Sequence, residues 1–113
     1  MSFFDKATIE GSQEYYKIST TARPYSFKDY GFKETKAGNF QLVRALDLNP
    51  RNTQSPKLKI TIAKDLKTLK MSLTTANGLK ALNIFKGANQ EEKQKQFAYI
   101  MADLIEHGCL EKA

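Results

Sequence analysis

An imidazole and a thiol near the end of the chain are side chains from which catalytic nucleophiles are made. His107 and Cys109 flank Gly108, and an imidazole close to a thiol can remove its proton. They lie where a helix is expected to end, a position that rarely holds two side chains in hydrogen-bond register. We therefore interpret His107 as favoured by a helix C-terminus and Cys109 as a small buried residue, and we predict no catalytic residue.

The sequence also lacks the residue sets of metal and cofactor sites. With one histidine and one cysteine among 113 residues, the chain cannot build an ordinary zinc cluster. A phosphate-binding loop, a dinucleotide fingerprint, a metalloprotease helix and a nucleophile elbow are all missing. We therefore predict no metal and no cofactor, and we favour a binding or accessory role over an enzyme.

A lysine-rich stretch from Lys57 to Thr75 carries most of the excess positive charge. The formal net charge is +6, and the residues from Lys57 to Lys70 hold five lysines against one aspartate. Lysine and hydroxyl side chains alternate here with aliphatic ones, which is the period of a half-buried strand. A basic surface raises the local concentration of anions such as phosphorylated metabolites, acidic proteins or nucleic acid.

Two strands joined by a turn around Asp65 must position these lysines. Their inward positions are aliphatic or methionine: Leu58, Ile60, Ile62, Leu69, Met71 and Leu73. Their outward positions give the candidate residues for binding a ligand or partner: Lys57, Lys59, Thr61, Lys70, Ser72 and Thr74. The competing interpretation is that such lysines only discourage the sheet from aggregating.

The residues before this stretch favour a strand, a short helix and a hairpin. Residues 12–19 are rich in strand formers, so Tyr15 and Tyr16 must face opposite ways, one into the core and one to solvent. Pro24 to Gly31 fits a short helix with proline at its first position and glycine at its end. Gly38-Asn39 has the turn chemistry of a hairpin between two extended runs.

One residue and two segments fit the strand pattern less clearly. Arg44 shares the parity of the apolar Phe40 and Leu42, so either it lies at the sheet margin or this face is not fully buried. Residues 49–56 form a polar loop between two prolines. The segment from Leu79 to Phe85 fits either a short helix or an extended strand.

A long helix is expected near the C-terminus. Asn89 can cap it, and Gly108 is suited to the left-handed conformation at its end. Its apolar residues recur every three or four positions: Phe97, Ile100, Met101, Leu104 and Ile105. The predicted fold is therefore α+β, with an antiparallel sheet of about five strands in the order strand, helix, four strands, helix. The helices pack on one face and leave the basic face open.

Composition places the chain among cytoplasmic proteins of one domain. Hydrophobic residues make up 41% and charged residues 27% of its 113 residues, which suits a single globular domain over residues 1–113. No apolar run approaches the roughly 20 residues of a membrane helix, and no secretory signal is visible. A single cysteine agrees with a reducing compartment.

Three stretches resemble a family of small Gram-positive bacterial proteins known as a domain of unknown function. They are Lys-Ala-Gly-Asn-Phe (36–40), Arg-x-Leu-Asp (44–47) and Thr-Thr-Ala-Asn-Gly (74–78). The resemblance covers nearly the whole chain and implies a fold like half of the TATA-binding protein, with a link to amino-acid metabolism. It implies no catalytic residue, and likeness of fold does not transmit DNA binding.

These observations lead to two functional hypotheses. The first is a small, non-catalytic binding or accessory protein linked to amino-acid metabolism, which uses the open basic face for an anionic ligand or an acidic protein partner. The alternative is a nucleic-acid-binding protein, whose affinity would fall steeply with salt. A membrane partner is not expected, and both a monomer and a homodimer remain open.

Overall fold

The computed structural model describes residues 6–9, 14–46, 56–74 and 91–113. Its elements are, in chain order, β1 (Tyr16–Ile18), α1 (Pro24–Tyr30), β2 (Lys33–Glu34), β3 (Phe40–Ala45), β4 (Lys57–Ile62), β5 (Leu69–Thr74), α2 (Glu91–Glu106) and β6 (Leu110–Lys112). The predicted α+β class and the order strand, helix, four strands, helix are confirmed. β6 is an additional strand, and the likeness to the TATA-binding protein stays a prediction.

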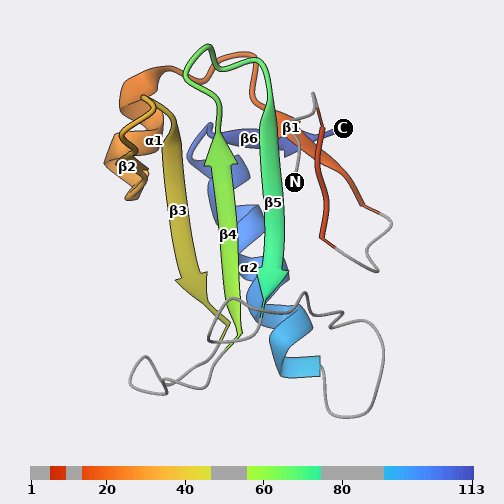
Figure 1. The fold of residues 1–113 in the computed structure, drawn as a ribbon. Coiled ribbons are helices and arrows are strands. Elements are labelled where there is room, and N and C mark those ends of the chain that lie inside the picture. Colours follow the sequence, from red (N-terminus) through yellow and green to blue (C-terminus); the bar gives the residue numbers. More distant parts are fainter. Residues whose placement is uncertain (1–5, 10–13, 47–55, 75–90) are drawn as a thin grey trace.

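Four strands form one antiparallel sheet in the order β2-β3-β4-β5 (Figure 1). The predicted hairpin at Gly38-Asn39 is confirmed, and Gly38 has a φ of 88°, a conformation that glycine adopts without strain. The predicted reversal around Asp65 is confirmed too, because its carboxylate accepts a hydrogen bond from the Lys67 backbone N–H at 2.9 Å. The Asn39 side chain joins the two turns by accepting from the Lys64 N–H at 3.0 Å.

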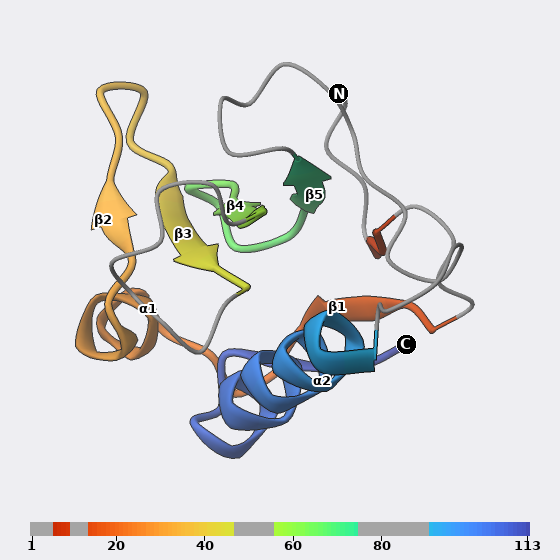
Figure 2. The ribbon, with the colours of Figure 1, turned by 90° about the horizontal axis from the view of Figure 1, so that it is seen from below.

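The inward face of this sheet forms the core, and the helices cover it. Figure 2 shows α2 along one side of the sheet, with β1 beside it on the same side. The predicted stripe on α2 is confirmed, since Ile105 is half-buried and its other four members are fully buried. Phe27 of α1 stacks on the inward-facing Phe40 of β3, with ring centroids 5.8 Å apart. Within the described ranges, no helix or strand lies over the opposite face (Figure 2).

The short helix α1 begins and ends where its local chemistry dictates. Pro24 occupies a first-turn position, where its missing N–H costs nothing. Gly31 follows the last residue with a φ of 128° and donates its N–H to the Phe27 carbonyl at 3.1 Å. The predicted helix boundaries are therefore confirmed.

The first strand does not join the main sheet, so the expected count of about five strands in one sheet becomes four strands plus a separate pair. β1 pairs with β6, and Ile18 lies opposite Leu110. Gly108, with a φ of 75°, reverses the chain after α2 and directs Leu110 back to the core. Tyr16 is 3% exposed and Tyr15 is 44% exposed, which confirms that these neighbours face opposite ways.

Other predictions on individual segments have mixed outcomes. Arg44 lies on the inward side of β3 and is half-buried. The inward face is therefore not fully buried at this end of β3. Most of the predicted loop at 49–56, the Leu79 to Phe85 segment and the Asn89 cap lie outside the described residues.

Candidate functional site

The outward side chains of β3, β4 and β5 form three rows across the sheet. From β3 through β4 to β5, the rows are Gln41, Thr61 and Lys70; Val43, Lys59 and Ser72; and Ala45, Lys57 and Thr74. We call these nine residues the outer grid. Because paired strands place opposite Cβ atoms about 5 Å apart, neighbours in a row can act on one ligand.

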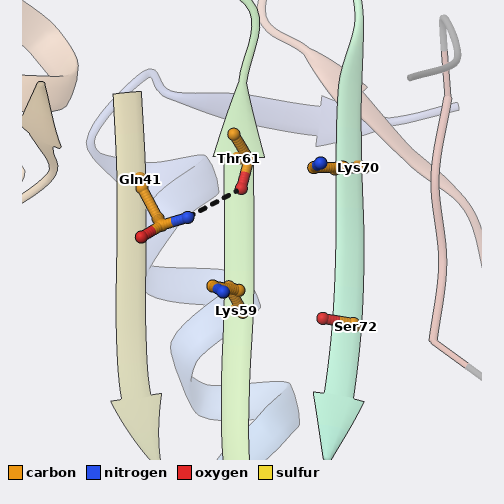
Figure 3. A pocket seen from close by; sticks show the side chains of 5 residues that line it. All are labelled: Gln41, Lys59, Thr61, Lys70 and Ser72. Atoms are coloured by element: carbon orange, nitrogen blue, oxygen red, sulfur yellow. Dashed lines mark hydrogen bonds between the residues drawn. The ribbon is translucent and has the colours of Figure 1, made fainter. Parts of the chain in front are cut away.

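A hollow of about 210 Å³ lies over the first two rows. Five polar side chains line it: Gln41, Lys59, Thr61, Lys70 and Ser72. Figure 3 shows Gln41 directed toward β4 from one side, and Lys70 and Ser72 directed toward β4 from the other. The two ammonium groups, the amide and the two hydroxyls can all donate hydrogen bonds to a ligand in the hollow.

Thr61 lies at the floor of this hollow. It is 4% exposed, which makes it the buried polar residue of the described core region. Its hydroxyl oxygen accepts a hydrogen bond from Gln41 Nε2 at 3.5 Å (Figure 3). Among the described residues, none accepts a hydrogen bond from the Thr61 hydroxyl itself.

The charged residues of the outer grid are all positive. Its three charged residues are all lysines, and none of its nine positions holds an acidic or aromatic side chain. Lys57 and Lys59 are exposed, and Lys70 is half-buried. Such a surface favours an anion electrostatically, and it offers no ring on which a nucleic-acid base could stack.

The structure brings together four of the six predicted site residues. Lys59, Thr61, Lys70 and Ser72 all line the hollow. Lys57 and Thr74 lie opposite each other in the third row and do not line it. Thr61 faces outward as predicted, yet it is buried, because parity determines the face of a strand and not the depth of a side chain.

Gln41 is the lining residue that the sequence interpretation missed. Its alternation with Phe40 and Leu42 placed it on the outward face of β3. What could not be read from alternation was the register that sets it opposite Thr61.

His107 and Cys109 do not form a catalytic pair. Cys109 is fully buried, and its thiol donates to the Ser26 carbonyl at 3.5 Å. Burial, with a smaller contribution from the Asp103 charge, raises the pKa of Cys109 to about 11. His107 instead places its Nδ1 2.8 Å from the carbonyl oxygen and 3.3 Å from the Oδ1 of Asp103. The thiol is therefore protonated and unreactive at neutral pH.

A second polar cluster joins the two helices on the other side of the sheet. Tyr30 of α1 donates its hydroxyl to Asp103 Oδ2 of α2 at 2.7 Å, and its ring lies edge-on to His107. Burial and the Asp103 carboxylate raise the pKa of Tyr30 to about 12, against the opposing effect of Arg44. These contacts hold helices together and do not surround a hollow that the structure describes.

The described residues contain neither a cluster of metal ligands nor a helix that could cross a membrane. No three His, Cys, Asp or Glu residues among them lie together as ion ligands. Of the helices in the described ranges, none has both the length and the apolar character needed to cross a bilayer.

Fold and site together define a small α+β protein whose sheet has one covered face and one polar, basic face. The chain belongs to the DUF1831 family, described as "Putative amino acid metabolism", whose model matches residues 1–111. A solved structure of a DUF1831 family protein from Lactobacillus plantarum is similar, with a TM-score of 0.89 and 33% sequence identity. The match covers 100% of this chain and 99% of that one. No curated protein matches the chain.

Proposed function

We propose that this protein binds a small anionic metabolite of amino-acid metabolism in the hollow of the outer grid. The observation that carries the proposal is the convergence of two lysines, one amide and two hydroxyls from three neighbouring strands. Binding sites are usually hollows with a few convergent polar groups. The description of the family supports the metabolic context.

The composition of the site supports binding over catalysis. Lys59 and Ser72 are cross-strand partners, yet no hydrogen bond joins the ammonium to the hydroxyl to make an activated nucleophile. Among the described residues, the side chains with raised pKa values are Tyr16, Tyr30 and Cys109, and they do not line the hollow. A non-catalytic role is therefore the better match, and a cytoplasmic location suits the single, buried cysteine.

Amide chemical shifts measured by NMR during titration with small anions test the proposal. Anions that bind should perturb the amides of β4 and β5 around Lys59, Thr61, Lys70 and Ser72. The variant K59Q/K70Q should lose this response. The matched control is K36Q/K95Q, which removes two exposed lysines from a turn and from α2 and should behave like the wild type.

A salt titration distinguishes this proposal from nucleic-acid binding. A small-anion site should lose little affinity between about 50 and 200 mM salt, whereas contacts to many backbone phosphates lose on the order of a thousandfold or more. If none of the small anions perturbs β4 and β5, and a single-stranded oligonucleotide does so with steep salt dependence, the alternative is correct.

A further inference from the structure

We propose that the exposed face of α2 binds the same face of a second copy of this chain, with the two helices antiparallel. This inference goes beyond the proposed function and does not depend on it. It follows from an exposed tyrosine, from the alanines beside it and from two opposite charges placed symmetrically around them.

Tyr99 lies in the middle of this face. It is 66% exposed, while its neighbours Ile100 and Met101 are buried in the core. Ala98 and Ala102 lie beside it and are also exposed. Tyrosine is enriched at interfaces between proteins, because its ring buries a large apolar area and its hydroxyl can stay in contact with water. The small alanine side chains leave space along the helix in which such a ring can pack.

Charged side chains bound this apolar centre. Lys95 lies one turn before Tyr99, Glu106 lies one turn after Ala102, and both are exposed. The steps from Lys95 to Tyr99, Ala102 and Glu106 are four, three and four residues, which is the spacing of a coiled-coil seam. These four side chains therefore follow one another along one side of the helix, and we call them the α2 seam.

The α2 seam is complementary to itself. The midpoint between Tyr99 and Ala102 is also the midpoint between Lys95 and Glu106. A two-fold axis through this point sets each tyrosine against an alanine of the other copy and each lysine against a glutamate. In a parallel pair, lysine would meet lysine and glutamate would meet glutamate, so the charges favour the antiparallel arrangement. Because both copies use the same surface, the contact closes as a dimer.

The α2 seam lies on the side of α2 that points away from the sheet. The buried stripe of this helix packs on the inward face of the sheet, so the seam and the outer grid are on opposite sides of the described fold (Figure 2). Dimerisation through α2 therefore leaves the hollow accessible. A substitution at Lys95 can alter the dimer without changing the residues that line the hollow.

The dimer is expected to be weak. The α2 seam spans about 17 Å of helix, and a contact between two single helices of this length is smaller than a standard protein interface. We expect a dissociation constant between about 10 µM and 1 mM, the range of small and reversible contacts.

Sedimentation velocity at protein concentrations from about 10 µM to 1 mM measures this dissociation constant. Y99S should weaken the dimer at least about tenfold, because it removes the central aromatic side chain. The matched control is Y25S, which removes a tyrosine that is 65% exposed on α1 and should leave the dissociation constant unchanged.

A charge swap tests the antiparallel pairing. K95E and E106K should each weaken the dimer about tenfold, because each sets like charges against each other at both ends of the contact. The double variant K95E/E106K restores opposite charges and should return to within about threefold of the wild type. K36E, at an exposed turn, should have no effect.

Three results would overturn the inference. The first is a wild-type protein that stays monomeric up to about 1 mM. The second is a dimer that Y99S leaves intact, which would use another surface. The third is a double variant K95E/E106K that is no tighter than either single variant. None of these results would affect the proposed binding of a small anion.

Discussion

Tyr30 and Asp103 join α1 to α2 through a hydrogen bond of 2.7 Å from the phenol to the carboxylate. The two residues are 73 positions apart in the sequence, so this bond connects the N-terminal third of the fold to its last helix. His107 lies next to both, with its ring centroid 5.2 Å from that of Tyr30. The cluster therefore stabilises the helical layer on which the sheet rests.

Removing the Tyr30 hydroxyl should lower the free energy of unfolding. In Y30F the half-buried Asp103 carboxylate loses its donor, and hydrogen bonds to charged groups contribute about 1.5 to 3 kcal/mol, less where water can substitute. We expect a loss of about 1 to 2 kcal/mol, measured by urea unfolding. Y25F removes the hydroxyl of a tyrosine that is 65% exposed and should change stability little. Equal stability of the two variants would contradict the structural role of the bond.

Stability should also fall at alkaline pH because of two tyrosines. Burial, with help from Glu14 for one and Asp103 for the other, raises the pKa values of Tyr16 and Tyr30 to about 12, above the ordinary 10.0. The folded state holds these protons more tightly than the unfolded state, so the stabilisation is complete below pH 10 and is lost as the pH rises to 12. Urea unfolding at pH 8, 10 and 11.5 measures the decline. The loss of unfolding free energy between pH 8 and 11.5 should be smaller in Y30F than in Y25F. Equal losses in the two variants would be evidence against a raised pKa of Tyr30.

The buried thiol should resist modification while the protein is folded. Because Cys109 is fully buried and its pKa is about 11, a disulfide reagent at pH 8 should react with it at least about tenfold more slowly than in urea. The variant A98C adds a thiol at an exposed position of α2 and serves as the control, since that thiol should react at once. Fast reaction of Cys109 in the native protein would place it outside the core.

Two neighbours on β5 should differ sharply in their effect on stability. Met71 is 2% exposed on the inward face, and M71A should cost about 2 to 4 kcal/mol through lost burial and a residual cavity. Ser72 faces outward, and S72A should stay within about 0.5 kcal/mol of the wild type. Thermal or urea unfolding of both variants tests the inward and outward assignment. A larger loss of stability in S72A than in M71A would contradict the assignment of Met71 to the inward face and Ser72 to the outward face.

Local chemistry made much of the fold predictable from the sequence. Pro24 and Gly31 delimit α1 because their backbone preferences act on their own positions. The alternation of Ile60 and Met71 with lysine and serine fixed which face of the hairpin is buried, since the strand period of two leaves no other choice.

Features that depend on contacts between residues far apart in the sequence could not be predicted. β6 spans three residues, Leu110–Lys112, too few to show a period, so its pairing with β1 was not expected. The position of Gln41 opposite Thr61 depends on the register between two strands, which the turns and the core set jointly. The depth of Thr61 depends on what covers its side chain, and no pattern within one strand contains that information.

The alternation of β4 and β5 has an evolutionary consequence. Inward positions maintain the folding free energy, while outward positions on the same strands carry the polar groups that a ligand would meet. Selection can therefore change one set of positions while conserving the other. Members of this family can differ in their outward side chains and still retain a common architecture.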